Sequence, residues 1–196
     1  MPDRIKAIIF DADGMVITGE RPSTRLARDF GVPIEKINQF FDNEFKDCIL
    51  GKSDLKEVVK PYLSKWNWKG TIDDLLHFWF AESYRIDEQM VAEIENLKAK
   101  GIKCFLATNQ EKYRVNYMKN QMGLGKVFDR IFSSAEIGAK KATNEFLDTI
   151  TDSLPKVKKE EILFYDDRQE NIDFAQTYGF QTMLYKSRED LSNIDI

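Results

Sequence analysis

The sequence contains few of the side chains that build zinc, disulfide and thiol-based sites. Its 196 residues include two cysteines, Cys48 and Cys104, and one histidine, His77. Two cysteines do not make the disulfide framework of a small secreted protein. A single histidine excludes a histidine-rich zinc site and argues against a histidine-dependent phosphatase. Neither cysteine is followed by arginine six positions later, so the loop of a cysteine-dependent phosphatase is absent as well.

Long apolar runs and an excess of positive charge are also missing. No stretch approaches the roughly 20 apolar residues that span a bilayer. The first apolar run stops at Asp11, which is too early for a signal peptide. The formal net charge is −4, whereas a nucleic-acid-binding surface is usually basic. We therefore expect a cytoplasmic protein with neither a membrane nor a nucleic acid as its partner.

One short apolar run stands near the start of the chain, and further runs alternate with helical patterns in its second half. The runs are IKAIIF before Asp11, IKCFLAT around Cys104, RIF from Arg130, EEILFY before Asp166 and TMLY from Thr182. Residues 87–101 and 170–179 show helical spacing of apolar residues, and both stretches end at a glycine. This alternation predicts an α/β fold, in which a mostly parallel sheet has helices on both faces.

Residues 15–87 have a different character. They are rich in amphipathic helical patterns and in aromatic residues, and they show no clear strand. We predict a core formed by residues 1–14 and 88–196, with residues 15–87 inserted as a small helical cap. The aromatic residues of this stretch at helical spacing are expected to pack between helices and not to stack on a ligand. The terminal stretch from Ser187 is expected to be loosely held.

Polar clusters follow four of the predicted strands. They are Asp11 with Asp13, Thr108 with Asn109, Lys140 with Lys141, and Asp166 with Asp167. The carboxyl ends of parallel strands share one edge of a sheet, so these clusters are expected to converge. Asp11 and Asp13 would repel each other unless a cation relieves them. Acids, a hydroxyl and an ammonium suit phosphoryl transfer with a carboxylate nucleophile, and oxygen ligands beside a phosphate favour Mg²⁺.

The four clusters resemble, in order, the four motifs of the haloacid dehalogenase (HAD) superfamily. The matching stretches are FDADGMV from Phe10, ATNQ from Ala107, IGAKK from Ile137 and FYDDRQENIDFA from Phe164. The resemblance covers residues 5–14 and 88–185. It implies a Rossmann-like core with a helical cap inserted after the first motif.

The resemblance also implies roles for individual residues. Asp11 matches the nucleophile, which also binds Mg²⁺, and Asp13 matches the general acid and base, whose backbone carbonyl completes the metal site. Thr108 matches the hydroxyl that donates to the phosphoryl oxygens, with Asn109 beside it. Asp167 occupies the position of a further metal ligand.

The third and fourth motifs each leave a choice between neighbours. Counting from Gly138 selects Lys141 over Lys140 as the residue that pairs with Asp11 and phosphate, although Ala142 stands where the family often has proline. Asp166 and Asn171 are expected to support the loop around Asp167.

Asp13 favours phosphoryl transfer over dehalogenation, because dehalogenases of this superfamily lack the second aspartate whereas phosphatases and phosphomutases keep it. We expect an Mg²⁺-dependent phosphohydrolase of a small phosphorylated metabolite, such as a sugar phosphate. The alternatives are a phosphomutase of the β-phosphoglucomutase type, a catalytically silent scaffold and a receiver-like module controlled by phosphorylation. Arg21, in a loop between core and cap, is a candidate substrate contact. A homo-oligomer stays an open alternative.

Overall fold

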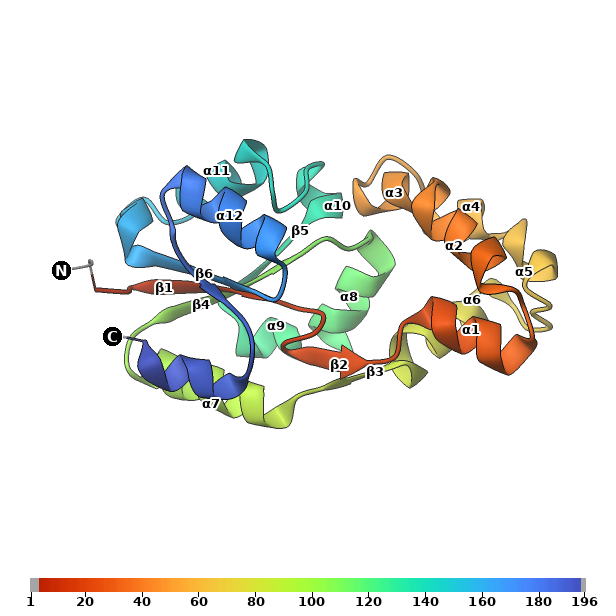
Figure 1. Ribbon diagram of the computed structural model, residues 1–196, viewed down its shortest axis with the longest axis horizontal. Coiled ribbons are helices and arrows are strands. Elements are labelled where there is room, and N and C mark those ends of the chain that lie inside the picture. Colours follow the sequence, from red (N-terminus) through yellow and green to blue (C-terminus); the bar gives the residue numbers. More distant parts are fainter. Residues whose placement is uncertain (1–3, 195–196) are drawn as a thin grey trace.

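The computed structural model describes residues 4–194, and its centre is a five-stranded parallel sheet (Figure 1). The strand order is β5-β4-β1-β6-β7. The five strands are β1 (Ala7–Asp11), β4 (Lys103–Thr108), β5 (Arg130–Ser133), β6 (Ile162–Asp166) and β7 (Gln181–Leu184). The chain therefore builds outward from β1 on one side, through β4 and β5, and then returns to β6 on the other. Such a reversal next to the first strand opens a crevice at the carboxyl ends of the strands.

Both faces of the sheet are buried. All five residues of β1 are buried, and alternate residues point to opposite faces. Ile8 and Phe10 pack into one hydrophobic cluster, whereas Ala7 and Ile9 pack into another. This double burial explains why the strands read as continuous apolar runs instead of alternating patterns.

Helices cover each face, which confirms the predicted α/β class (Figure 1). One face packs against α7 (Glu88–Ala99), α8 (Lys112–Asn120) and α9 (Leu124–Val127), and the other against α11 (Asn144–Asp152) and α12 (Gln169–Tyr178). The short α10 (Ser134–Ile137) follows β5, and η2 (Lys159–Glu161) precedes β6. Within residues 4–194, no helix has both the length and the apolar character needed to cross a membrane.

A helical lobe, defined as Pro22–Glu82, extends to one side of the sheet (Figure 1). It consists of α1 (Pro22–Phe30), α2 (Ile34–Asp42), α3 (Glu44–Ile49), α4 (Leu55–Val59), α5 (Tyr62–Lys65), α6 (Ile72–His77) and the π-helix η1 (Phe78–Glu82). These helices share a hydrophobic cluster of their own, in which Phe40 and Trp66 are completely buried. The expectation that the aromatic residues pack between helices is confirmed for Trp66, Phe78 and Phe80. Trp79 is buried in the same cluster but also borders a cavity.

The expectation that residues 15–87 contain no strand is wrong. Strands β2 (Ile17–Gly19) and β3 (Tyr84–Ile86) pair antiparallel and join the lobe to the core. Three residues are too few to show an alternating pattern, so the sequence gave no signal for them. Met15, Val16 and Ile17 pack in the core cluster. The division into core and cap stays a prediction.

The expectation of a loosely held terminal stretch is wrong for its described part. A 3₁₀ helix, η3 (Arg188–Asn193), forms there, and Leu191 is buried against the core. Tyr165 of β6 also donates a 2.9 Å hydrogen bond to the carbonyl of Ser187. Residues 195 and 196 lie outside the described part of the chain.

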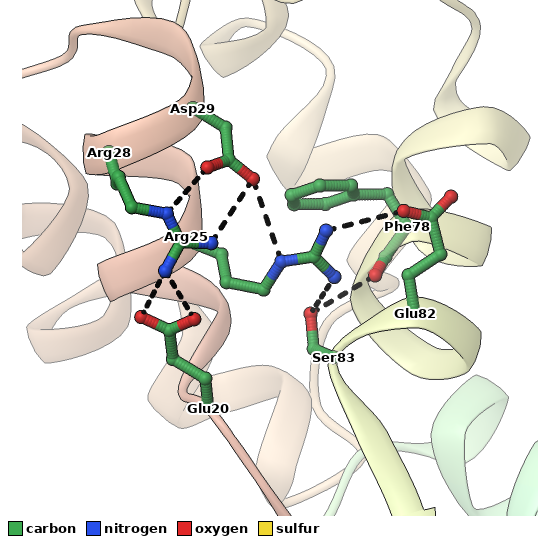
Figure 2. Close-up of polar contacts among 7 residues, drawn as sticks. All are labelled: Glu20, Arg25, Arg28, Asp29, Phe78, Glu82 and Ser83. Carbon is green, nitrogen blue, oxygen red and sulfur yellow. Dashed lines mark hydrogen bonds and ion pairs between the residues drawn. The ribbon is translucent and has the colours of Figure 1, made fainter.

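Two arginines of α1 form a polar network where the lobe meets its linker (Figure 2). Arg25 donates to Ser83 at 3.1 Å and to Glu82 at 3.3 Å, and its guanidinium lies 4.1 Å from the ring centroid of Phe78. Arg28 instead pairs with the acids beside it on the outer side of the helix. The side chain of Arg25 is 15% exposed and that of Arg28 is 57% exposed. Both arginines therefore pair with acidic side chains, but Arg25 does so in a mostly buried position and Arg28 in an exposed one.

We expect Arg25→Met to lower the free energy of unfolding by about 1–2 kcal/mol, because its hydrogen bond to the buried Ser83 and its contact with the buried Phe78 are largely shielded from water. Arg28→Met is the matched control, and it should leave stability unchanged within error because exposed ion pairs contribute little. Urea unfolding followed by circular dichroism measures the free energy of unfolding of both variants. Equal losses in the two variants would contradict the assignment of Arg25 as the structural contact.

Candidate active site

The six residues predicted for the site all line one cavity of about 990 Å³. Asp11 ends β1 and Thr108 ends β4, while Asp167 directly follows β6. Neighbouring strands therefore deliver these side chains to the same sheet edge, as expected for parallel strands. Asn109, Asp13 and Lys141 reach the cavity from the loops that follow β4, β1 and α10.

A buried ion pair network, here called the Lys141 triad, joins Lys141 to Asp11 and Asp166. The ammonium of Lys141 donates to Oδ1 of Asp11 and, at 2.7 Å, to Oδ2 of Asp166. The backbone N–H of Lys141 donates to Oδ1 of Asn109 at 3.0 Å, which fixes the loop. Lys140 is exposed to solvent. Of the two candidate lysines, the structure thus brings Lys141 into the site.

Burial and charge act against each other on the groups of the triad. Burial alone would lower the pKa of Lys141, but Asp11 and Asp166 outweigh it and raise that pKa above its usual value, so the side chain is an ammonium. Burial raises the pKa of Asp11 to about 7, opposed by Lys141 and assisted by the charge of Asp166. The carboxyl group of Asp11 is therefore costly to ionise unless further positive charge is present.

Three carboxylates form a cluster that suits a divalent cation. Asp11, Asp166 and Asp167 each have an oxygen within 4.8 Å of the others. The oxygens of Asp166 already accept hydrogen bonds from Lys141, from the side chain of Asn171 and from the backbone of Arg168. Asp11 and the exposed Asp167 are therefore the two carboxylates of the cluster with oxygen atoms still available to bind a cation. Asp166 and Asn171 hold the loop and the lysine, in keeping with the supporting role expected for them.

Gly14 makes room for this cluster. Its φ is +93°, and a Cβ atom added there would lie 2.4 Å from Oδ2 of Asp167. A side chain at position 14 would therefore collide with the carboxylate and strain the backbone. Hard oxygen donors around a space that is kept open by glycine fit Mg²⁺.

Asp13 also borders the cavity, and two residues that the sequence analysis did not select donate hydrogen bonds to it. Arg114 donates to Oδ1 of Asp13 at 2.5 Å, and Gln110 donates to Oδ2 at 2.8 Å. Arg114 lies in the first turn of α8, whereas Gln110 lies in the loop two residues before that helix begins. Nothing in the sequence links either residue to Asp13.

The helical lobe supplies the opposite wall of the cavity. Its aromatic part consists of Phe41, Phe45 and Trp79, and Tyr84 of β3 continues it. Asn38, Asp42 and the candidate contact Arg21 add exposed polar groups to the same wall. The cavity therefore has an ionic floor and a mixed aromatic and polar wall.

The raised pKa of Asp11 predicts that Asp11→Asn stabilises the protein in the absence of divalent metal. Between about pH 4 and pH 7 the carboxyl group of Asp11 keeps its proton in the folded protein. In the unfolded chain, where its pKa is 3.8, it has lost that proton. The free energy of unfolding therefore falls as pH rises through this window, because ionisation is then forced on the folded state. Asparagine removes this cost, so the variant should exceed the parent protein by at least about 1 kcal/mol at pH 8 and by less at pH 5.

Urea unfolding in the presence of a chelator measures this difference. The exposed Glu95→Gln serves as a control for the change in net charge, and it should show no such pH dependence. A variant that is less stable than the parent at pH 8 would contradict the unfavourable ionisation of Asp11.

Comparison with known proteins shows similarity along the whole chain. A solved HAD family enzyme from Bacteroides thetaiotaomicron matches with a TM-score of 0.82 and 19% identity, covering 97% of this chain and 98% of that one. The same enzyme has also been solved in complex with magnesium and inorganic phosphate. A predicted HAD-like family hydrolase from Porphyromonas gingivalis matches with a TM-score of 0.75 and 25% identity, covering 96% of this chain and 94% of that one.

Among curated proteins, the sesquiterpene phosphatase astK of Aspergillus oryzae is 28% identical over 95 residues. That match spans 48% of this chain and 48% of the fungal protein, about half of each. The model of the haloacid dehalogenase-like hydrolases matches residues 5–179, and the chain therefore belongs to this family of hydrolases.

Proposed function

We propose that this protein is an Mg²⁺-dependent phosphohydrolase that cleaves a small phosphorylated metabolite through an aspartyl-phosphate on Asp11. The observation that carries the proposal is the Lys141 triad, in a cavity that also contains Asp13 and Thr108. The names of the similar proteins support it, because one is a phosphatase and another was solved with magnesium and phosphate.

The residues suit the first half of this reaction. Asp11 attacks phosphorus with the carboxylate oxygen that does not accept from Lys141, and the bond to the leaving oxygen breaks. Lys141, Thr108 and the amide of Asn109 donate to the phosphoryl oxygens, where negative charge is concentrated. When bound by Asp11, Asp167 and the backbone carbonyl of Asp13, Mg²⁺ supplies positive charge that offsets the repulsion between phosphate and carboxylates.

Asp13 handles the protons. It gives its proton to the leaving oxygen as the phosphorus–oxygen bond breaks, which releases a neutral alcohol. It then takes a proton from the water that attacks the aspartyl-phosphate, and Asp11 leaves as a carboxylate. The cycle restores both aspartates and consumes one water for each phosphate released.

The cavity favours an organic group with both an apolar face and hydrogen-bonding groups. Its volume of about 990 Å³ exceeds what a phosphate alone requires, and its lobe wall combines Phe41, Phe45 and Trp79 with Asn38 and Asp42. Aromatic rings can pack against the apolar face of a sugar, and the polar side chains can bind its hydroxyls. The phosphatase named among the similar proteins makes an isoprenoid phosphate the second candidate.

We expect Gly14→Ala to weaken Mg²⁺ binding about 10- to 100-fold, because the added Cβ displaces Asp167. Isothermal titration of the protein with MgCl₂ measures this affinity. Gly101→Ala is the matched control, since Gly101 has a φ of +89° but a Cβ there meets nothing within 4 Å. Unchanged affinity in Gly14→Ala would exclude Asp167 as a ligand.

Phosphate release from a panel of sugar phosphates, isoprenoid phosphates, nucleotides and an aryl phosphate tests the function directly. We expect release that requires Mg²⁺ and that falls to background in Asp11→Asn, because the variant lacks the nucleophile. Isomerisation of a hexose phosphate without free phosphate would favour a phosphomutase. A folded protein that binds Mg²⁺ and turns over nothing on the panel would favour the silent scaffold.

A further inference from the structure

Both carboxylate oxygens of Asp13 accept hydrogen bonds, one from a side chain in the first turn of α8 and one from the loop between β4 and α8. The two hydrogen bonds are 2.5 Å from Arg114 and 2.8 Å from Gln110. The side chain of Arg114 is 3% exposed and Gln110 is buried, whereas the side chain of Asp13 is 35% exposed. All three residues border the cavity, and the carboxylate of Asp13 is the most exposed of them.

Arg114 also contacts the linker to the helical lobe. Its guanidinium lies 3.9 Å from the ring centroid of Tyr84, which belongs to β3. A buried guanidinium is costly without a carboxylate partner, and Asp13 is the partner it pairs with at this distance. Arg114 therefore ties three parts of the site together: the loop after β1, the start of α8 and the linker strand β3.

Gln110, like Arg114, donates its hydrogen bond to Asp13. Its amide nitrogen donates to Asp13, although its Oε1 is buried and has no hydrogen-bond partner among the described residues. The amide is therefore oriented by its hydrogen bond to Asp13, because no donor among the described residues holds its Oε1. Donors on both oxygens of Asp13 leave the carboxylate one orientation instead of several.

We propose that Arg114, assisted by Gln110, is a positioning residue for Asp13. The proposal rests on the proposed function, in which Asp13 transfers the protons. Once Asp13 has given its proton to the leaving oxygen it is a carboxylate, and Arg114 holds that carboxylate where the attacking water must be deprotonated. Arg114 itself neither touches the reacting atoms nor exchanges a proton.

The choice of substrate separates this role from a general loss of structure. An alkoxide leaves poorly unless it is protonated, whereas nitrophenolate leaves without an acid. A poorly placed Asp13 therefore harms the first step on an alkyl phosphate more than on nitrophenyl phosphate. The ratio kcat/KM reports this step, because it covers events up to formation of the aspartyl-phosphate.

The experiment compares Arg114→Met, Arg114→Lys and Asp13→Asn on nitrophenyl phosphate and on the best alkyl phosphate of the panel. We expect Arg114→Met to lower kcat/KM about 100-fold on the alkyl phosphate and less than about tenfold on nitrophenyl phosphate. Asp13→Asn should show the same selectivity. Arg114→Lys keeps the positive charge but offers a single donor group, so it should recover part of the lost kcat/KM. It also replaces Arg114→Met as the test variant if Arg114→Met fails to fold. Lys119→Met, exposed on the same helix, is the control.

A double variant and a structure complete the test. Arg114→Met added to Asp13→Asn should cost little more than Asp13→Asn alone, because both changes remove one interaction. Equal losses on the two substrates, or fully additive losses, would overturn the proposal. In a crystal structure of Arg114→Met, Asp13 should occupy more than one rotamer. A single unchanged rotamer would overturn the positioning role even if the parent protein released no phosphate, an outcome that would separately refute the proposed function.

Discussion

The burial of Lys141 between Asp11 and Asp166 is the interaction on which the rest of the site depends. Removing an ammonium and two carboxylates from water is costly, and it is tolerated only where the charges meet with good hydrogen-bond geometry. The sheet provides that geometry, because Phe10 of β1 is in register with Tyr165 of β6 and the two acids follow directly. The loop after α10 then has to bring Lys141 to the same point, and Asn109 fixes its backbone.

The charge balance of the site explains why it is built from such costly parts. Asp11, Asp13, Asp166 and Asp167 face two buried cations, Lys141 and Arg114. Burial raises the pKa of Asp11, and the negative charges of Asp166 and Asp13 raise it further. A fold selected for stability alone would avoid this arrangement, so the surplus is better understood as capacity for a cation.

Much of this fold follows from local patterns in the sequence. Strands buried on both faces read as apolar runs, α7 begins after the capping Asp87, and polar residues after each strand mark the sheet edge that carries the cavity. Strands β2 and β3 could not be predicted, because three residues with a polar centre carry no periodicity. Their pairing depends on contacts between positions about 70 residues apart, and such contacts leave no local trace.

The surroundings of Asp13 escaped prediction for a related reason. Gly14, with its φ of +93°, donates its backbone N–H to the carbonyl of Ile17 at 2.8 Å and turns the chain back on itself. That turn directs Asp13 toward β4 and α8, where Arg114 lies 101 residues away in the sequence. Gln110, in the loop before α8, and Arg114, in its first turn, meet Asp13 only because of this turn, and no local pattern in the sequence indicates the contact.

Helix α8 connects the floor of the cavity to its wall. Its first turn carries Arg114, which holds Asp13, while its outer side meets the lobe through Lys112 and Tyr113, which both donate to Asp54. Lys112 is 58% exposed, so its ion pair contributes little to holding the lobe in place.

Further along the same helix, the ring of Tyr117 packs 5.9 Å from that of Phe80. Such packing between aromatic rings is not screened by salt, unlike the exposed pair at Asp54. This ring contact, together with the hydrogen bond from Ser134 of α10 to the carbonyl of Ile49 in α3, therefore links the lobe to the core that carries Asp11. A substitution in these contacts would therefore move the lobe wall of the cavity relative to Asp11 without changing any residue that lines the cavity.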